Sequence, residues 1–300
     1  MIMKKFILIL ILFSSIHLFA QSAGNTGLSF LKFGFGARNS AMGDVGNVVS
    51  NDLTALHYNP SRLSFTENNE VMFTHNSWIQ DISSEMFGIK TYIFDLPVAV
   101  GFNITNISDL EVRQIPGEPV SKFDANYFYG SLSTAYKVDE DFSLGLTLKY
   151  LYEGLLNDES TGFGIDLGAS YFLPFEGLAL SAVVRNLGSM NELRNEATKL
   201  PSEFRIGSSY NFKLQDYKLD FIAAAEYQKY FDANDHLNFG FEISYDRLIA
   251  IRGGYQTNYE SRNFTAGIGL LWGNLKFDYS YIPFSLGIGS GNLFSLGFKF

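Results

Sequence analysis

Histidines are the side chains of this chain best suited to catalysis or metal binding, but their spacing favours neither. His57, His75 and His236 lie in separate stretches, and none has a second histidine four residues away on one helix face. The chain has no cysteine, which excludes disulfides, thiolate metal sites and cysteine nucleophiles. A serine hydrolase that uses His75 or His236 is the enzymatic alternative. We expect no catalytic residues, no metal, no cofactor and no enzyme activity.

Two glycine runs have the spacing of phosphate-binding loops. Neither Gly34-x-Gly36 nor Gly287-x-Gly289-x-Gly291 lies between a strand and the start of a helix, which phosphate binding of this kind requires. The formal charge of the chain is −9, whereas nucleic-acid binding needs a basic face. We therefore expect neither a nucleotide nor a nucleic acid as a partner.

The first twenty residues have the pattern of a secretory signal peptide. Lys4 and Lys5 give a positive start, residues 6–13 are apolar, and Ala20 is a small residue before polar Gln21. An N-terminal membrane anchor is the alternative, but the apolar run is short for a spanning helix. We expect cleavage after Ala20 and export from the cytoplasm.

The rest of the chain is rich in aromatic residues and follows a period of two. Aromatic side chains make up 16% of the 300 residues, and charged side chains only 18%. In residues 142–150 and 294–300, large apolar residues alternate with Gly, Ser, Thr or Lys. Strands that alternate in this way over about ten residues are typical of barrels in the outer membrane of Gram-negative bacteria. A soluble barrel would leave the aromatic outer face exposed to water.

Fourteen such segments follow one another in residues 70–300. They are 70–78, 86–94, 97–106, 123–136, 142–153, 162–173, 178–187, 203–212, 218–229, 236–245, 248–257, 262–272, 274–282 and 292–300. Even-numbered connections are mostly tight and odd-numbered ones tend to be longer, as outer-membrane barrels require. We predict an all-β, 14-stranded antiparallel transmembrane barrel that contacts outer-membrane lipid.

Residues 21–69 do not alternate, and they are rich in Gly, Asn and Ser. This segment is too long for a free tail and too apolar for a linker, and a fourteen-stranded barrel has a lumen that must be filled. We predict that it folds inward as a plug. Asp52 is expected to cap a short helical turn that ends at Asn59-Pro60.

This segment resembles the N-terminal pattern of the PorV/PorQ family, within the FadL-like group of barrels. The matching runs are SFLKFGFGAR (29–38), AMGD (41–44), Asp52, YNP (58–60) and HNSWIQD (75–81). The motif residues that the resemblance assigns to the plug are Gly36, Arg38, Met42, Gly43, Asp52, Asn59 and Pro60. At Ser61-Arg62 the family more often has Ala-Gly, so the large Arg62 must find space or a carboxylate.

The resemblance implies two functions. One is a role in type IX secretion, in which such barrels handle or attach exported proteins together with secretion components. The other is FadL-like transport of hydrophobic small molecules.

Charges that the strand phase places in the lumen help to choose between these functions. They are Lys90, Lys149, Asp166, Arg205, Asp220, Glu226, Glu242, Arg252, Lys276, Asp278 and Lys299. Both signs occur on neighbouring strands, so they can pair with each other and with Arg38 and Asp44 of the plug. Because an apolar solute needs an apolar path, this lumen favours a plugged secretion scaffold over a transporter.

The odd-numbered connections form the expected outer face. They cover 79–85, 107–122, 154–161, 188–201, 230–235, 258–261 and 283–291, and acids outnumber bases in them. Charged loops also serve solubility alone. The two longest, 107–122 and 188–201, are the expected contacts of a protein partner.

Overall fold

The computed structural model describes residues 26–66, 68–113 and 115–300, and within them most of the chain is β-strand. The predicted signal peptide (1–20) lies outside the described residues, as do residues 21–25 and 67 of the predicted plug. The barrel strands are β1 (Glu70–Ser77), β2 (Ile82–Ile93), β3 (Leu96–Val112), β4 (Ser121–Lys137), β5 (Phe142–Leu155), β6 (Asp158–Phe172), β7 (Leu178–Met190), β10 (Glu203–Leu214), β11 (Leu219–Tyr230), β12 (Asp235–Tyr245), β13 (Ile249–Gln256), β14 (Phe264–Trp272), β15 (Leu275–Pro283) and β16 (Ser290–Lys299).

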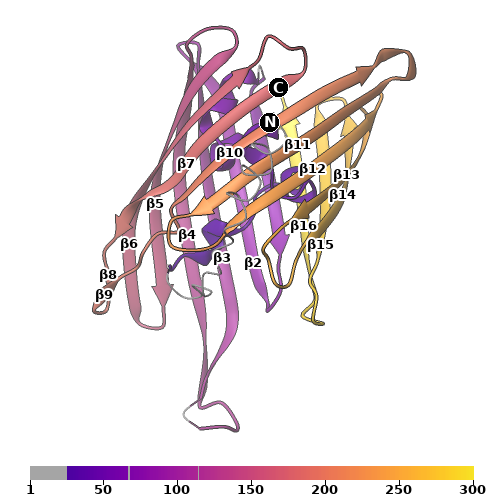
Figure 1. The fold of residues 1–300 in the computed structure, drawn as a ribbon. Helices are drawn as coiled ribbons and strands as arrows, with labels where there is room; N and C mark the ends of the chain where they lie inside the picture. The colour runs from indigo at the N-terminus through magenta and orange to yellow at the C-terminus, as the bar shows by residue number, and fades with distance from the viewer. Residues whose placement is uncertain (1–25, 67, 114) are drawn as a thin grey trace, which may run out of the picture.

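The fourteen strands form one closed antiparallel barrel (Figure 1). Each strand pairs with its neighbour along the chain, and β1 closes the ring against β16 with Phe73 opposite Leu296. Closure leaves no strand edge unpaired at membrane depth, which the hydrocarbon core demands. The predicted fold class, an all-β, 14-stranded antiparallel barrel, is confirmed.

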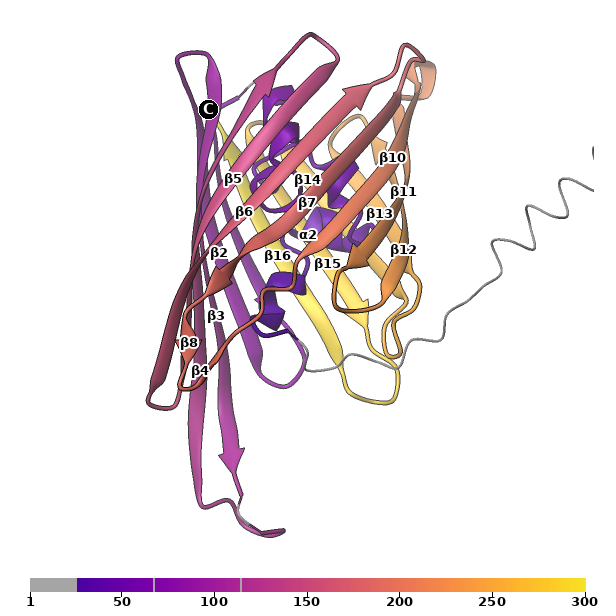
Figure 2. The same cartoon turned by 60° about the vertical axis from the view of Figure 1, so that its left-hand side comes forward.

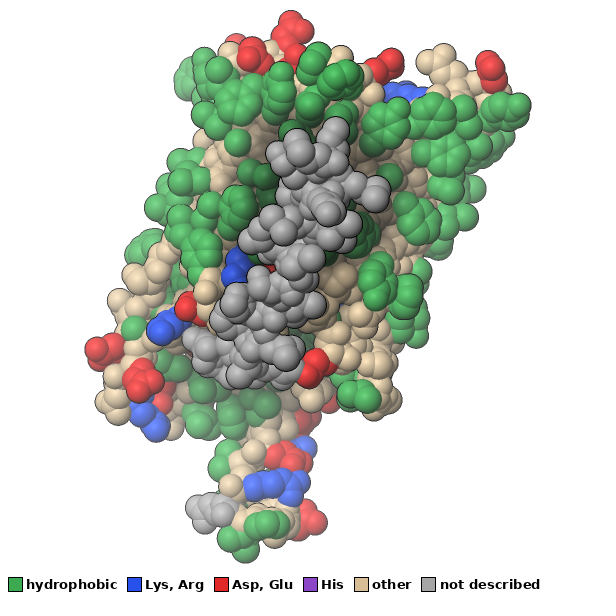
Figure 3. Space-filling view, viewed as in Figure 1, with side chains coloured by type: hydrophobic (Ala, Val, Ile, Leu, Met, Phe, Trp, Pro, Cys, Tyr) green, Lys and Arg blue, Asp and Glu red, His purple; other side chains and the backbone are tan. Residues whose placement is uncertain are grey.

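Alternating side chains explain why these segments form the wall. In β5, Leu144, Leu146 and Leu148 are exposed, whereas Ser143, Thr147 and Lys149 are buried. Hydrophobic side chains cover much of the visible wall, and charged side chains lie mostly towards its ends (Figure 3). Among the described residues, no helix has the length and hydropathy needed to cross a membrane.

The two ends of the barrel differ. The turn end carries the connections β2–β3, β4–β5, β6–β7, β10–β11, β12–β13 and β14–β15, together with the start of β1 and the end of β16. There Phe300 N–H donates to Asn69 O at 3.0 Å. The loop end carries the other connections, including a small hairpin of β8 (Glu192–Leu193) and β9 (Glu196–Ala197). The β10–β11 turn contains η3 (Gln215–Tyr217).

Strands at the loop end run further than the alternation predicted. Much of the expected 107–122 loop is strand, because β3 extends to Val112 and β4 begins at Ser121. The β5–β6 connection shrinks to residues 156 and 157, an exception to the parity of connection lengths. These extensions mix polar and apolar residues, and the β3–β4 register shifts between Ile107 and Leu110, so the regular alternation does not continue through them.

Residues 26–66, here called the N-terminal segment, lie inside the barrel (Figure 2). Its short helices are η1 (Ser29–Lys32), α2 (Ala37–Ala41), α3 (Gly46–Val49), α4 (Ala55–Tyr58) and η2 (Pro60–Phe65). Helix α2 packs on β13–β16, α3 on β7, β10 and β11, and η2 on β3–β6. The segment therefore contacts opposite parts of the wall.

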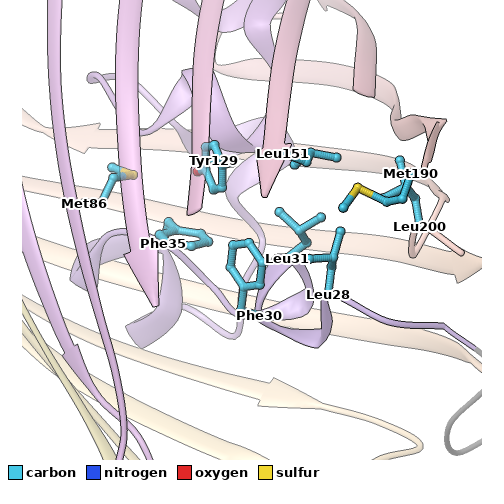
Figure 4. Packing of buried hydrophobic residues seen from close by; sticks show 9 residues of the cluster. All are labelled: Leu28, Phe30, Leu31, Phe35, Met86, Tyr129, Leu151, Met190 and Leu200. Carbon is cyan, nitrogen blue, oxygen red and sulfur yellow. The ribbon is translucent and has the colours of Figure 1, made fainter. Parts of the chain in front are cut away.

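An apolar cluster anchors the first part of this segment. Leu28, Phe30, Leu31 and Phe35 of the segment meet Tyr129 and other apolar side chains of the wall (Figure 4). The Phe30 and Tyr129 rings lie 6.1 Å apart, centre to centre, and close to parallel. Burying these side chains stabilises the segment inside the lumen by the hydrophobic effect.

Candidate functional site in the barrel lumen

The lumen holds two networks of buried ion pairs that join the N-terminal segment to the wall. The first begins at Arg38 of α2, which lies 2.8 Å from Glu242 of β12. Glu242 also accepts from Arg252 of β13 at 2.5 Å, and Arg252 reaches Asp278 of β15 at 2.7 Å. Lys276 completes the chain by bridging Asp278 and Asp52, at 3.2 and 2.6 Å.

This first network is electrically balanced. Three cations, Arg38, Arg252 and Lys276, face three carboxylates, Glu242, Asp278 and Asp52. Buried charges are tolerated when they are paired and hydrogen-bonded, and a missing partner is costly. The network can therefore hold α2 and the loop before α4 against one side of the barrel.

The second network centres on Arg205 of β10. Its guanidinium lies 3.1 Å from Glu226, from Glu203 and from Asp44 of the N-terminal segment. Asp44 also accepts the Tyr58 hydroxyl at 2.5 Å. Arg185 pairs with Glu203 at 2.8 Å.

Lys149 and Asp166 form a separate buried pair further along the wall. Their Nζ and Oδ2 atoms lie 2.6 Å apart, and the Lys149 ammonium also donates to Asn186 Oδ1 at 2.8 Å. The neighbouring Asn186 N–H donates to Asp166 Oδ1 at 2.8 Å, at an irregularity in the β6–β7 pairing. Lys149 and Asp166 are thus paired with each other and hydrogen-bonded to Asn186, and neither forms an ion pair with a charged residue of the N-terminal segment.

The remaining predicted lumen charges lie towards the turn end. Lys90 is buried and donates to Thr66 O at 2.9 Å. Asp220 is half-buried and lies 3.9 Å from Arg247. Lys299 lines a cavity of about 300 Å³ beside Lys276. All eleven charges that the strand phase placed inward are buried or half-buried in the structure.

Glycines of the N-terminal motif permit close approach to the wall. Gly43 has φ +71°, and a Cβ there would lie 2.5 Å from Phe239 O. Met42 packs over Gly240, whose own Cβ would lie 2.3 Å from Met42 O. Gly36, with φ +85°, precedes α2, whose Ala37 N–H donates to Ser295 Oγ at 2.8 Å.

Asn59 and Pro60 shape the turn from α4 into η2. The Asn59 amide donates to Asn47 Oδ1 at 2.8 Å, and its own oxygen accepts from Ser61 N–H at 3.0 Å. Pro60 occupies the first position of η2, where its missing N–H costs nothing. The turn packs on Gly145 and Gly168 of the wall.

The expected capping role of Asp52 is wrong in detail. Helix α4 begins at Ala55, its N-cap is Thr54, and no side chain caps it. Asp52 instead accepts from Thr54 N–H at 3.0 Å with one oxygen and pairs with Lys276 through the other. The Asp52–Lys276 ion pair could not be predicted from sequence, because it depends on how the N-terminal segment folds inside the barrel.

Sequence reasoning missed Arg185, Glu203 and Glu70, all buried on the inner face. The period of two could have placed them inward. Glu203 lies two residues before Arg205 on the same strand face, and Arg185 lies two residues after Val183, which also faces inward. Glu70 and Glu203 are the first residues of their strands, where the phase is least certain, and Arg185 lies next to the irregularity in the β6–β7 pairing.

The three histidines occupy separate environments. His57 contacts the Tyr129 hydroxyl at 3.2 Å and Arg185 at 2.8 Å, while His75 contacts Glu85 at 3.1 Å. His236 contacts Thr257 O at 2.9 Å. Each ring thus has its own polar partner in a different part of the barrel.

A cavity of about 400 Å³ lies at the loop end between η1 and the β11–β12 and β13–β14 connections. The His236 ring stacks on Tyr259 at 3.9 Å, and the Arg262 guanidinium lies 4.4 Å from the Tyr259 ring. Burial raises the pKa of Tyr259, which keeps its hydroxyl neutral.

Comparisons with known proteins agree with this geometry. A family model described as type IX secretion system protein PorV matches residues 19–232. The Pseudomonas putida toluene transporter TodX has a similar structure, with a TM-score of 0.64 at 10% identity over 89% of this chain and 99% of that one. No curated protein matches the chain.

Two further solved structures share the architecture. The CymD monoaromatic hydrocarbon channel has a TM-score of 0.61 at 12% identity, over 91% of this chain and 97% of that one. A Pseudomonas aeruginosa FadL homologue has a TM-score of 0.54 at 12% identity, over 88% and 97%. At these identities the likeness shows the fold alone.

The predicted resemblance to PorV and to FadL-like barrels is confirmed. The family match covers more than two thirds of the chain, and the closed barrel is similar in fold to the solved FadL-like structures. This chain is an outer-membrane β-barrel protein and belongs to the PorV family.

Proposed function

We propose that this barrel is a non-enzymatic scaffold of type IX secretion that handles or attaches exported proteins at the outer membrane. The observation that carries the proposal is the pair of charge networks across the lumen. A solute crossing the barrel would have to displace Arg38, Arg205 or their carboxylates from partners within 3.1 Å. A barrel plugged in this way by its N-terminal segment serves as a rigid scaffold, and exported proteins contact its surface.

The β3–β4 hairpin supports a contact face at the loop end. Pairing of β2 with β3 stops at Ile107, and pairing of β4 with β5 begins at Ala125. Beyond these points the hairpin strands pair only with each other, and the hairpin projects from the barrel (Figure 1). A long projection on a rigid wall is suited to protein contact.

Charge gives the expected character of the partner. On the hairpin, Lys122 pairs with Asp109 at 2.9 Å, and Arg113 pairs with Glu111. The bases there are thus already neutralised, and the remaining acids give the loop end a negative balance. A partner with a basic patch would be steered to it, more slowly as salt rises.

Transport of hydrophobic small molecules is the second candidate. The loop-end cavity favours it, because Phe33, Trp78 and Phe284 line a space of about 400 Å³. The similar solved structures include a toluene transporter and a monoaromatic hydrocarbon channel. Under this candidate the cavity is the capture site, and the N-terminal segment must move.

Affinity purification from detergent-solubilised outer membranes distinguishes the two functions. The scaffold should co-purify secretion components or exported proteins. The transporter should instead carry an apolar small molecule, detectable by mass spectrometry of an organic extract. A tagged barrel of another family from the same membranes gives the background for both measurements.

A further inference from the structure

A large cavity lies at the turn end, away from the proposed contact face. It has a volume of about 860 Å³ and lies between α3, η2, the β6–β7 turn and the β10–β11 hairpin. Apolar side chains form much of its wall: Val48, Val49, Phe65, Phe172, Ala179 and Ile222. Lys213, Asp216 and Tyr217 line it and are exposed, so the cavity opens to solvent at this end.

Arg62 of η2 lines this cavity and is only 7% exposed. Its guanidinium carbon lies 5.5 Å from the Phe65 ring and 5.2 Å from the Phe172 ring, which fixes its position. Its Nε–H donates to Ser50 O at 3.1 Å. Its Nη1 is buried and has no hydrogen-bond partner among the described residues.

Arg62 differs from the other arginines that the structure buries as deeply. Each of those lies within 3.1 Å of at least one carboxylate: Arg38, Arg185, Arg205 and Arg252. No Asp or Glu within the described ranges pairs with Arg62. A buried guanidinium without a counter-charge is costly, so a missing anion is the physical expectation.

We propose that this cavity binds a small amphiphilic anion through Arg62. The planar guanidinium matches a carboxylate or phosphate oxygen pair, which would satisfy the unpartnered Nη1. The volume exceeds that of a small inorganic anion, and the apolar wall beside Phe172 and Ile222 suits a hydrocarbon tail. The site goes beyond the proposed secretion role and does not depend on it.

The head group can come from a free amphiphile or from a phospholipid at the membrane edge. Both present the same anionic oxygens to Arg62, and the exposed rim admits either one. The exposed Lys213 at that rim provides a control for Arg62, because it is also a cation that lines this cavity but is not buried.

Calorimetric titration of the full-length protein in phosphatidylcholine nanodiscs tests the proposal. The probes are octanoate, octyl phosphate and octanol. We expect Arg62→Met to lower the affinity for both anions about ten- to hundredfold and to leave the affinity for octanol unchanged. Lys213→Met should change anion affinity by about fivefold at most. Ile222→Trp, which fills the cavity, should also lower the affinity for both anions. This variant keeps the test possible if Arg62→Met fails to fold.

Nanodiscs that contain phosphatidylglycerol identify the source of the head group. Weaker octanoate binding in them indicates competition by the phospholipid, and unchanged binding indicates a free amphiphile. The proposal is overturned if octanol binds the native chain as tightly as octanoate. It is also overturned if Arg62→Met, with normal heat-modifiable mobility, or Ile222→Trp keeps native affinity for both anions.

Discussion

Arg38 and Glu242 lie 204 positions apart in the chain and form a two-pronged ion pair inside the barrel. Arg38 Nε–H donates to Glu242 Oε2 at 2.8 Å, and Nη2–H donates to Oε1 at 3.0 Å. A third donor, Nη1–H, reaches Val49 O at 2.8 Å. One side chain thus ties α2 both to the wall and to the end of α3.

Arg38→Met should destabilise the folded barrel, because it leaves the balanced network with one uncompensated negative charge. Removing one partner of a buried pair costs about 3–5 kcal/mol. Urea unfolding in lipid vesicles measures the loss. Adding Glu242→Gln to Arg38→Met should recover part of it, since the excess charge is removed. Equal stabilities of the native and Arg38→Met barrels would show that the pair does not hold the segment.

Neighbouring positions on β12 should respond differently to the same substitution. Phe241 is 51% exposed on the outer wall, whereas Glu242 is buried in the lumen. Phe241→Arg should cost about 2–4 kcal/mol near the bilayer midplane, because a charge then faces lipid. Glu242→Arg should act through repulsion from Arg38 and Arg252 instead.

Membrane thickness separates the two effects. The cost of Phe241→Arg should fall in vesicles of thinner lipids, in which position 241 lies nearer the interface, while that of Glu242→Arg should not. An equal response of both variants to thickness would contradict the assigned faces.

Gly43→Ala should loosen the N-terminal segment, since the new Cβ would meet Phe239 O at 2.5 Å and the residue has a positive φ. We expect faster proteolysis of this segment in the folded barrel. Gly130→Ala is the matched control, because its Cβ would make only ordinary contacts, at 3.6 Å and beyond. If both variants are as resistant as the native chain, the close approach of Gly43 to the wall does not constrain the segment.

Single cysteines can test the orientation, because the chain has none of its own. Ile115 at the loop end is 76% exposed, and Tyr217 at the turn end is 69% exposed. In intact cells, Ile115→Cys should react with a membrane-impermeant maleimide and Tyr217→Cys should not. After lysis both should react. The reverse labelling pattern in intact cells would place the turn end outside.

Period-two patterning made the fold predictable from sequence. Lipid and lumen impose opposite demands on successive side chains, so residues such as Phe241 and Glu242 reveal their faces directly. The strand ends were less predictable, because β3 and β4 continue past their pairing with β2 and β5 as a projecting hairpin, in which the regular alternation stops.

The lumen charges could be predicted, but their partners could not. The strand phase placed Lys276 and Asp278 inward, yet the pairing of Lys276 with Asp52 depends on how the N-terminal segment packs. The same holds for Arg62, whose sequence position indicated only that it must find space or a carboxylate. In the structure its guanidinium lies against the Phe65 and Phe172 rings and pairs with no carboxylate among the described residues.

Surface attachment of exported proteins in a hairpin variant tests the secretion role most directly. Residues 109–123 are replaced by a short turn, and the matched control replaces residues 174–176 at the opposite end. Both variants must keep native heat-modifiable mobility in the outer membrane. We expect attachment to fall in the hairpin variant alone. Unchanged attachment in a correctly inserted hairpin variant would contradict the proposed contact face and favour the transporter.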